Sequence, residues 1–126
     1  VAMHPADDVD DPAARHPLDP LHLATQTGGD LPLQRDLLKL FVVQSAELMA
    51  ALRDANPIAA GDLAHKLSGS ARAIGAFELA AAAAKLDGTL PPKARQAALE
   101  SLAVAFDRAL FAVEAYLRKL SPRPEV

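Results

Sequence analysis

Apolar residues recur at intervals of three and four along most of the chain, in long segments separated by polar residues and prolines. Residues at this spacing share one side of an α-helix, which has about 3.6 residues per turn. No convincing run of alternating β-branched residues, the pattern of half-buried strands, interrupts these segments. The pattern therefore predicts four long amphipathic helices, at residues 31–55, 57–74, 76–87 and 93–120.

Residues typical of helix ends stand at the borders of these segments. Asp19 and Pro20 are suited to the N-cap and the first position of a short helix, which Gly28-Gly29 would end. Asn56-Pro57 stops one long helix and starts the next, and Gly75 stops that one. Because the connections are short, consecutive helices should run antiparallel. We therefore expect an all-α fold, an antiparallel up-down four-helix bundle with a short additional N-terminal helix.

The two ends of the chain differ in composition from the bundle. Residues 1–17 contain four aspartates and three prolines but almost no large apolar side chain, which favours a solvated tail. Two further prolines lie in residues 122–126. The expected organisation is a disordered N-terminal tail at 1–17, the bundle at 18–121 and a flexible C-terminus at 122–126.

The composition supports this class and excludes several functions. Apolar residues make up 51% of the 126 residues, but much of that share is alanine, the best helix former. The net charge of −3 does not indicate the basic surface that is typical of nucleic-acid-binding proteins. The chain has no cysteine, so disulfides and thiolate metal sites are excluded. Because no apolar stretch reaches the length of a membrane span and no signal-peptide pattern is present, we expect no membrane partner and a cytoplasmic location.

His65 stands out because of the direction in which it must point. On a helix, Leu67 and Ile74 lie roughly 180–200° around the axis from His65, on the apolar side. Gly69 and Arg72 lie within roughly 40° of it. The imidazole is therefore expected on the solvent side, beside a gap without a side chain. A helical glycine costs about 1 kcal/mol relative to alanine, so its place here indicates that something large approaches His65.

The position of His65 suits phosphoryl chemistry. An exposed imidazole is largely neutral at pH 7 and can act as a nucleophile. Lys66 and Arg72 are placed to offset the negative charge of a phosphoryl group. The chain contains no GxxxxGKS/T loop, no GxGxxG fingerprint and no plausible cluster of magnesium ligands. We expect a carrier without kinase activity, whose partners supply the metal, and whether such a carrier counts as an enzyme stays open.

The residues around His65 also form a motif. The stretch His65-Lys66-Leu67-Ser68-Gly69-Ser70-Ala71, followed by Ile74-Gly75, resembles the signature of histidine-containing phosphotransfer (HPt) domains of bacterial phosphorelays. The family pattern is His-x-Leu-Lys-Gly-Ser-Ser/Ala, then small residues that end in Leu/Ile-Gly. The resemblance covers about residues 18–120, including Ala60-Gly61-Asp62 before the histidine and Ala84-Lys85-Leu86-Asp87 after it. The chain departs from the pattern at Ser68, where the family usually has lysine.

The resemblance implies that Nε2 of His65 accepts a phosphoryl group from a receiver-domain aspartate and passes it to another response regulator. The implied partners are receiver domains of response regulators and of a hybrid sensor histidine kinase. Mg²⁺ is then expected on the partner receiver only, this chain has no cofactor or metal of its own, and it acts as a monomer. The departure from the family pattern leaves open which group neutralises the phosphoryl charge. The candidates are Arg72, Lys66, Lys85 and the hydroxyl of Ser68.

A partner that reaches His65 needs a docking surface. We expect Gly69 to give clearance, and Gly61 to do the same on the other side of His65. Ile58 shares the exposed face and has no obvious place in the core. The helix at 31–55 has two apolar shoulders, one containing Leu38, Val42 and Met49 and the other Leu40 and Ala51. The sequence does not decide which shoulder adjoins His65, and we take Leu38 and Val42 as docking candidates.

Other functions compete with phosphotransfer. The bundle could bind a receiver domain and inhibit it without being phosphorylated, although such a module has no need of His65. It could also be an inert structural bundle, or a metal-binding protein through His4, His16 and His22, whose spacing is irregular. The capped start and the proline-rich end favour a free-standing domain, but a piece of a larger kinase would look similar.

Overall fold

The structure is a computed structural model that describes residues 16–120. These residues form helices without any strand, as the apolar spacing predicted. The predicted C-terminal segment and all but two residues of the predicted N-terminal tail lie outside the described range. None of the described helices combines the length and the apolar composition needed to cross a membrane. The helices are α3 (Pro20–Thr27), α4 (Leu31–Asp54), α5 (Pro57–Ile74), α6 (Phe77–Ala84) and α7 (Pro92–Leu120).

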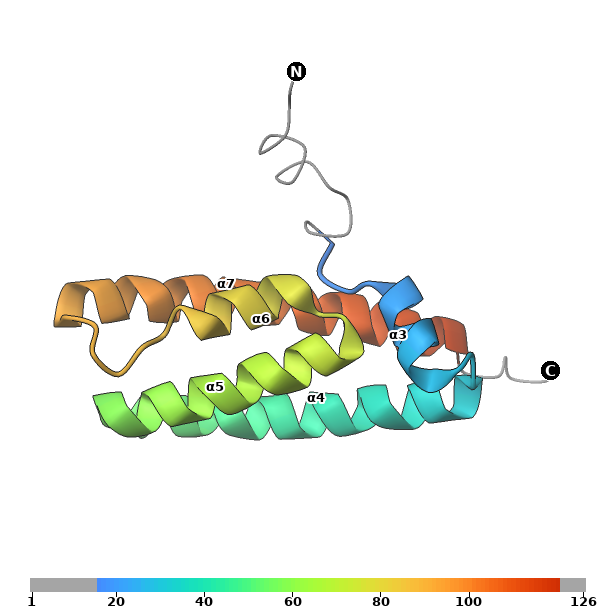
Figure 1. The fold of residues 1–126 in the computed structure, drawn as a ribbon, viewed down its shortest axis with the longest axis horizontal. Coiled ribbons are helices and arrows are strands. Elements are labelled where there is room, and N and C mark those ends of the chain that lie inside the picture. Colours follow the sequence, from blue (N-terminus) through green and yellow to red (C-terminus); the bar gives the residue numbers. More distant parts are fainter. Residues whose placement is uncertain (1–15, 121–126) are drawn as a thin grey trace, which may run out of the picture.

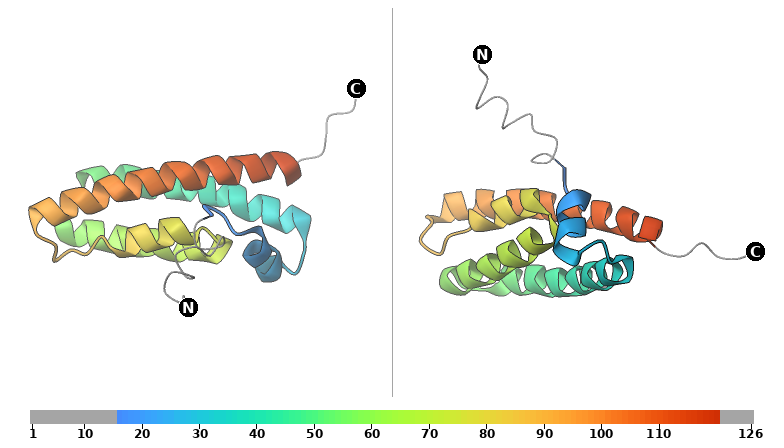
Figure 2. Two further views of the ribbon diagram at one scale, coloured as in Figure 1. Left: turned by 90° about the horizontal axis from the view of Figure 1, so that it is seen from above. Right: turned by 45° about the vertical axis from the view of Figure 1, so that its right-hand side comes forward.

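The four helices from α4 to α7 run alternately in opposite directions and form one bundle (Figure 1). Each packs against the next in the chain, and α7 also packs against α4. The short α3 lies at one end of the bundle, against α4 and α5 (Figure 2). The antiparallel up-down bundle with an additional N-terminal helix is therefore confirmed.

The predicted capping residues set most of the helix ends. A side-chain oxygen of Asp19, Asp30 or Asn56 accepts hydrogen bonds from backbone N–H groups in the first turn of α3, α4 or α5. These contacts satisfy donors that have no partner within the helix. Gly28 and Gly75 follow α3 and α5 with φ of 61° and 90°, a left-handed conformation that glycine adopts without strain. The histidine-bearing helix thus has the predicted bounds, 57–74.

The end of α6 differs from the prediction. The helix ends at Ala84, three residues before the predicted end at 87. The carboxylate of Asp87 accepts hydrogen bonds from the backbone N–H and the hydroxyl of Thr89, at 2.8 and 2.9 Å. An aspartate that bonds two residues ahead stabilises a turn in competition with helix. Asp87 therefore belongs to the connection between α6 and α7.

Small residues let α5 and α6 approach each other closely. Ala60, Ala64 and Ala71 on α5 are buried, as are Ala80 and Ala83 on α6. The distance between two helix axes depends on the size of the side chains between them, so small side chains such as alanine allow a close approach. This packing brings the C-terminal end of α6 beside the middle of α5, where His65 lies.

A buried polar network joins α3, α4 and α7. The amide nitrogen of Gln34 donates to the hydroxyl of Thr27 at 3.1 Å, and that hydroxyl donates to the carbonyl of Leu23 at 2.8 Å. The hydroxyl of Tyr116 donates to the amide oxygen of Gln34 at 3.2 Å. Gln34 is 1% exposed, so the bonds satisfy polar groups that would otherwise be buried without partners. The network ties the end of the bundle at α3 together.

Candidate functional site

The outward face of α5 carries the candidate site. His65 is exposed, and so are Asp62 and Gly69. On the opposite side of the helix, Ala64 and Leu67 are fully buried. The exposure of His65 predicted from the helical period is therefore confirmed. An imidazole in this position can be reached by a second protein without any movement of the bundle.

A hollow of about 660 Å³ lies beside His65. It lies between α5, the C-terminal end of α6 and the connection that leads to α7. Ile58, 74% exposed, stands at the same hollow and gives it an apolar edge. The residues that line the hollow are Ile58, Gly61, Asp62, His65, Ala83, Ala84, Leu86, Asp87, Gly88 and Thr89.

The charged groups in this hollow are acidic. Asp62 lies one turn before His65 on α5, and Asp87 lies across the hollow in the α6–α7 connection. Hydrogen bonds from Thr89 lower the pKa of Asp87. The bond from the backbone N–H has the larger effect, and the bond from the hydroxyl has the next largest. Asp87 is therefore an anion at neutral pH, with its carboxylate held in place. No lysine or arginine is among the described residues that line the hollow.

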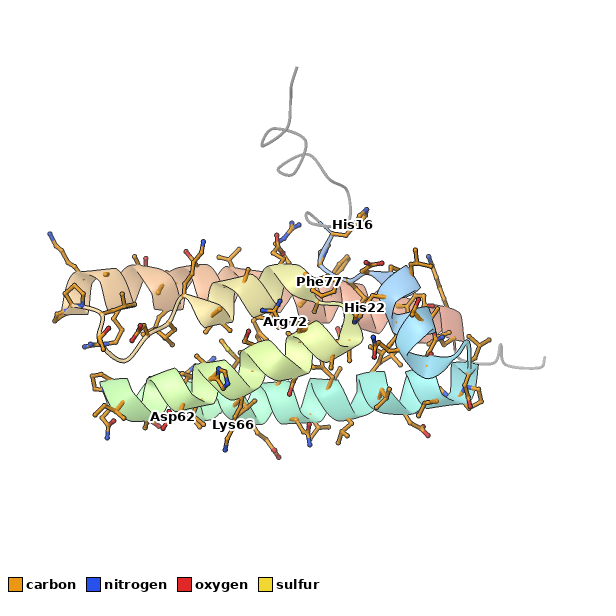
Figure 3. All side chains as sticks on the ribbon, in the orientation of Figure 1. His16, His22, Asp62, Lys66, Arg72 and Phe77 are labelled. Carbon is orange, nitrogen blue, oxygen red and sulfur yellow. The ribbon has the colours of Figure 1, made fainter. Side chains whose placement is uncertain are left out.

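The three basic candidates lie outside the hollow. Arg72 and Lys66 leave α5 in different directions, Arg72 on the α6 side and Lys66 on the α4 side (Figure 3). Lys66 there shares a second depression with Glu47 of α4. Lys85 is exposed at the end of α6. Within residues 16–120, none of these three side chains has a hydrogen-bond or ion-pair partner, so the phosphate-supporting role of each stays a prediction.

Ser68 was placed wrongly as a group that supports the phosphoryl. Its hydroxyl is buried and donates a hydrogen bond to the carbonyl of Ala80, at 2.9 Å. Position 68 lies about 60° around the helix from His65, and in the structure this is the side that packs against α6. A short side chain there reaches the neighbouring backbone and does not reach the imidazole's open side. The hydroxyl therefore links α5 to α6.

The two glycines predicted to give clearance differ. A Cβ added at Gly69 would meet no atom within 4 Å, so the surface beside His65 is open there. A Cβ added at Gly61 would lie 3.0 Å from the backbone nitrogen of Gly88. Gly61 is therefore needed for the close approach of α5 and the α6–α7 connection. The structure thus gives Gly61 a packing role, and its role in clearing space for a partner stays a prediction.

The predicted docking shoulder of α4 is also wrong. Leu38 is fully buried, and Val42 is half-buried and packs against the same core. The α4 side that adjoins the open face of α5 includes Leu40, which shares a shallow depression with Ala73 of α5. Leu40 is 51% exposed. The exposed apolar residue of α4 that adjoins α5 therefore belongs to the second shoulder, which the sequence offered as the alternative.

The arrangement provides a nucleophile on an open surface. Ile58 lines the same hollow as His65, and Gly69 leaves a gap beside it, whereas Leu40 lies further along the bundle beside Ala73. An apolar surface with polar edges is typical of a protein interaction site. The geometry suits transfer of a small group to and from a docked protein better than catalysis within an enclosed pocket.

Comparison with known proteins agrees with the motif around His65. The family model described as Hpt domain matches residues 36–121, more than half of the chain. The match includes all of α5, α6 and α7 and most of α4, whereas α3 lies outside it. No similar curated protein and no similar solved structure was found.

Proposed function

The chain belongs to the Hpt domain family, and we propose that it carries a phosphoryl group on His65 between receiver domains of a His–Asp phosphorelay. The family's chemistry is histidine phosphotransfer in phosphorelays. The observation that carries the proposal is the exposure of His65 on the outer face of α5, beside the open space at Gly69. His65 is the histidine of the family motif.

The transfer step needs little from this chain beyond a positioned nucleophile. The lone pair on Nε2 of His65 attacks the phosphorus of a receiver's aspartyl phosphate. A P–N bond forms as the P–O bond breaks, and the electron pair returns to the aspartate carboxylate. Such transfers depend on alignment and on neutralisation of charge rather than on acid–base groups. We assign the Mg²⁺ that assists the step to the receiver domain.

The partner is expected to dock over α5 and the adjoining side of α4. Ile58 and Leu40 are large apolar side chains that are 74% and 51% exposed, and they would be covered in such a complex. Gly69 leaves room for the receiver to bring its aspartate in line with Nε2. The partners that we propose for this surface are receiver domains of response regulators and of a hybrid sensor kinase. We expect the chain to act as a monomer, since the same surface has to bind and release different receivers.

Arg72 is the strongest candidate for neutralising the phosphoryl charge within this chain. It lies two turns after His65, about 20° around the helix axis, and its guanidinium has no partner within residues 16–120. A guanidinium can donate two hydrogen bonds to a phosphoryl group. Lys66 points to the other side of α5, and Lys85 does not line the hollow at His65.

A transfer experiment tests the proposal. The protein is incubated with a phosphorylated receiver domain, and the label should be stable in base and labile in acid, as expected of phosphohistidine. His65→Gln should abolish the label and leave the helical circular dichroism unchanged. His16→Gln is the matched control, because His16 is also exposed but lies outside the bundle helices. Label retained in folded His65→Gln would disprove the assignment.

A second candidate is a receiver-binding module that inhibits without being phosphorylated. The acidic hollow and the buried Ser68 favour it, because a stable phosphohistidine would be helped by a nearby cation. Receiver binding measured by calorimetry separates the two functions. Binding with no label from any phosphorylated receiver would support the inhibitory module, and binding with label on His65 would support phosphotransfer.

A further inference from the structure

We propose that Asp62 and Asp87 destabilise the phosphorylated form of His65, so that the exchange equilibrium with a receiver domain lies further toward the receiver's aspartyl phosphate. The inference rests on the proposed function and adds which side the exchange equilibrium of each step favours. It depends on the charges around His65, because the described residues that line the hollow beside it include two carboxylates and no lysine or arginine.

The first observation is the position of the two carboxylates. Residues three apart on a helix have Cβ atoms about 5–6 Å apart, so Asp62 is a direct neighbour of His65. Asp87 faces the same hollow from the α6–α7 connection. Its carboxylate cannot turn away freely, because the N–H and the hydroxyl of Thr89 hold it at 2.8 and 2.9 Å.

The second observation is independent of the first and concerns the missing counter-charge. Ser68 faces α6, and its hydroxyl donates its hydrogen bond to the carbonyl of Ala80. Lys66 lies on the α4 side of α5, where it lines a separate depression with Glu47. Arg72 is the remaining cation on the exposed face of α5, and it lies two turns from His65 rather than beside it.

Phosphorylation of His65 therefore adds negative charge near the carboxylates of Asp62 and Asp87. In the accepting step the receiver's P–O bond breaks and a P–N bond forms at Nε2, and the hollow gains a group with a charge of nearly −2. Like charges at this separation repel, and the repulsion is larger in the phosphorylated state than in the free state. Transfer to a receiver removes that group and relieves the repulsion. The exchange equilibrium is shifted toward the receiver's aspartyl phosphate by this difference.

The test replaces both carboxylates with neutral amides. In Asp62→Asn/Asp87→Asn, the amide oxygen at position 87 can still accept the hydrogen bond from Thr89, so the turn is retained. We expect the labelled fraction of the domain at equilibrium with a receiver to rise, with the exchange constant changing by about three- to tenfold at low salt. The difference from wild type should shrink as salt is raised to about 1 M, where charges are screened beyond about 3 Å.

A small donor provides a measurement that does not depend on docking. Phosphoramidate phosphorylates imidazole as its own P–N bond breaks and ammonia leaves with the electron pair. Because this donor is an anion, the double variant should be labelled severalfold faster than wild type at low salt. The phosphohistidine can be followed by its acid lability and by ³¹P NMR.

A remote double variant controls for net charge. Asp107→Asn/Glu114→Gln removes two exposed carboxylates from α7, a helix that does not contact α5. It should behave as wild type in both measurements. If the hollow variant also matches wild type while His65 is labelled, the inference is wrong and phosphotransfer stands. An equal shift in the remote variant would also overturn it, and absence of any label on wild-type His65 would overturn the proposed function itself.

Discussion

Two glycines on α5 look alike in the sequence but occupy different surroundings. Gly61 abuts the backbone of Gly88, where an added Cβ would lie 3.0 Å from the nitrogen. Gly69 faces open solvent, with no atom within 4 Å of an added Cβ. Both positions lack a side chain inside a helix, where glycine is unfavourable by about 1 kcal/mol relative to alanine. At Gly61 the bundle itself requires the glycine, whereas at Gly69 nothing in the bundle does.

The difference separates folding from function on one helix face. The region of Gly61 is an internal contact between α5 and the α6–α7 connection. The region of Gly69 is an unoccupied surface beside His65 that a partner can use. No contact within the bundle accounts for the glycine at position 69, and this supports our proposal that a partner docks there. The following predictions test this contrast.

The largest effect is expected from Gly69→Leu. A leucine there would project into the space beside His65 and prevent a receiver from aligning its aspartate, and a displacement of about 1 Å can slow such a step by about 100-fold. The fold should be retained or stabilised by up to about 1 kcal/mol, since leucine favours helix more than glycine. Phosphotransfer rates and thermal unfolding measure the two effects. Normal transfer by this variant would show that Gly69 is not at the docking surface.

The same substitution at Gly61 should act in the opposite way. Gly61→Leu would force α5 away from Gly88, and overpacking of this kind lowers the free energy of unfolding by about 1–3 kcal/mol. Denaturant unfolding measures the loss. The folded fraction should lose less transfer activity than Gly69→Leu does. A stable Gly61→Leu protein with no transfer would mean that Gly61 also clears space for the partner.

A smaller effect is expected at Ser68. Ser68→Ala removes the bond to the carbonyl of Ala80 and should lower the free energy of unfolding by about 1 kcal/mol. Ser101→Ala, at an exposed serine of α7, is the control and should change little. Transfer should be retained in both variants. A fall in transfer without a loss of stability in Ser68→Ala would restore the hydroxyl as a group that supports the phosphoryl.

The smallest effect is expected at low pH, in the α6–α7 connection that Gly61 contacts. Hydrogen bonds from Thr89 lower the pKa of Asp87 in the folded state. The stability that these bonds contribute is fully present above the pKa that Asp87 has in the unfolded chain. It is lost as the pH falls through the lower pKa that Asp87 has in the folded protein. The protection factor of the backbone N–H of Thr89, its intrinsic exchange rate divided by its observed rate, should therefore fall in acid before the protection factors in the middle of α5 do. Simultaneous loss of protection in both regions would argue against a local role for Asp87.

The site was predicted well where it depends on one helix. The period of 3.6 residues and the caps at Asn56 and Gly75 are local properties, so the bounds of α5 and the exposure of His65 followed from the sequence. The end of α6 was missed because the Asp87–Thr89 turn competes with helix over only a few residues. Gln34 was missed as well, although a polar residue one turn before Leu38 on the core side of its helix is a signal for a buried hydrogen bond.

The errors at Leu38 and Ser68 and the missed packing contact of Gly61 have one cause. Each concerns which neighbour a side chain meets, and that depends on how the helices rotate against each other. Periodicity indicates that α4 has a core stripe with two shoulders, but the shoulder that adjoins α5 is decided only when all four helices pack. The same holds for a serine that finds a carbonyl on α6 and for a glycine that meets another backbone.

The amino-acid sequence by itself determined the helices, their order and the outward direction of His65, because hydrogen bonding and side-chain direction within a helix are local. Only the tertiary structure decided the surroundings of that histidine. It placed the carboxylates of Asp62 and Asp87 in one hollow, turned Ser68 inward and left the space at Gly69 open. These contacts join residues from different helices, and their distances are set by the close packing of small side chains between α5 and α6.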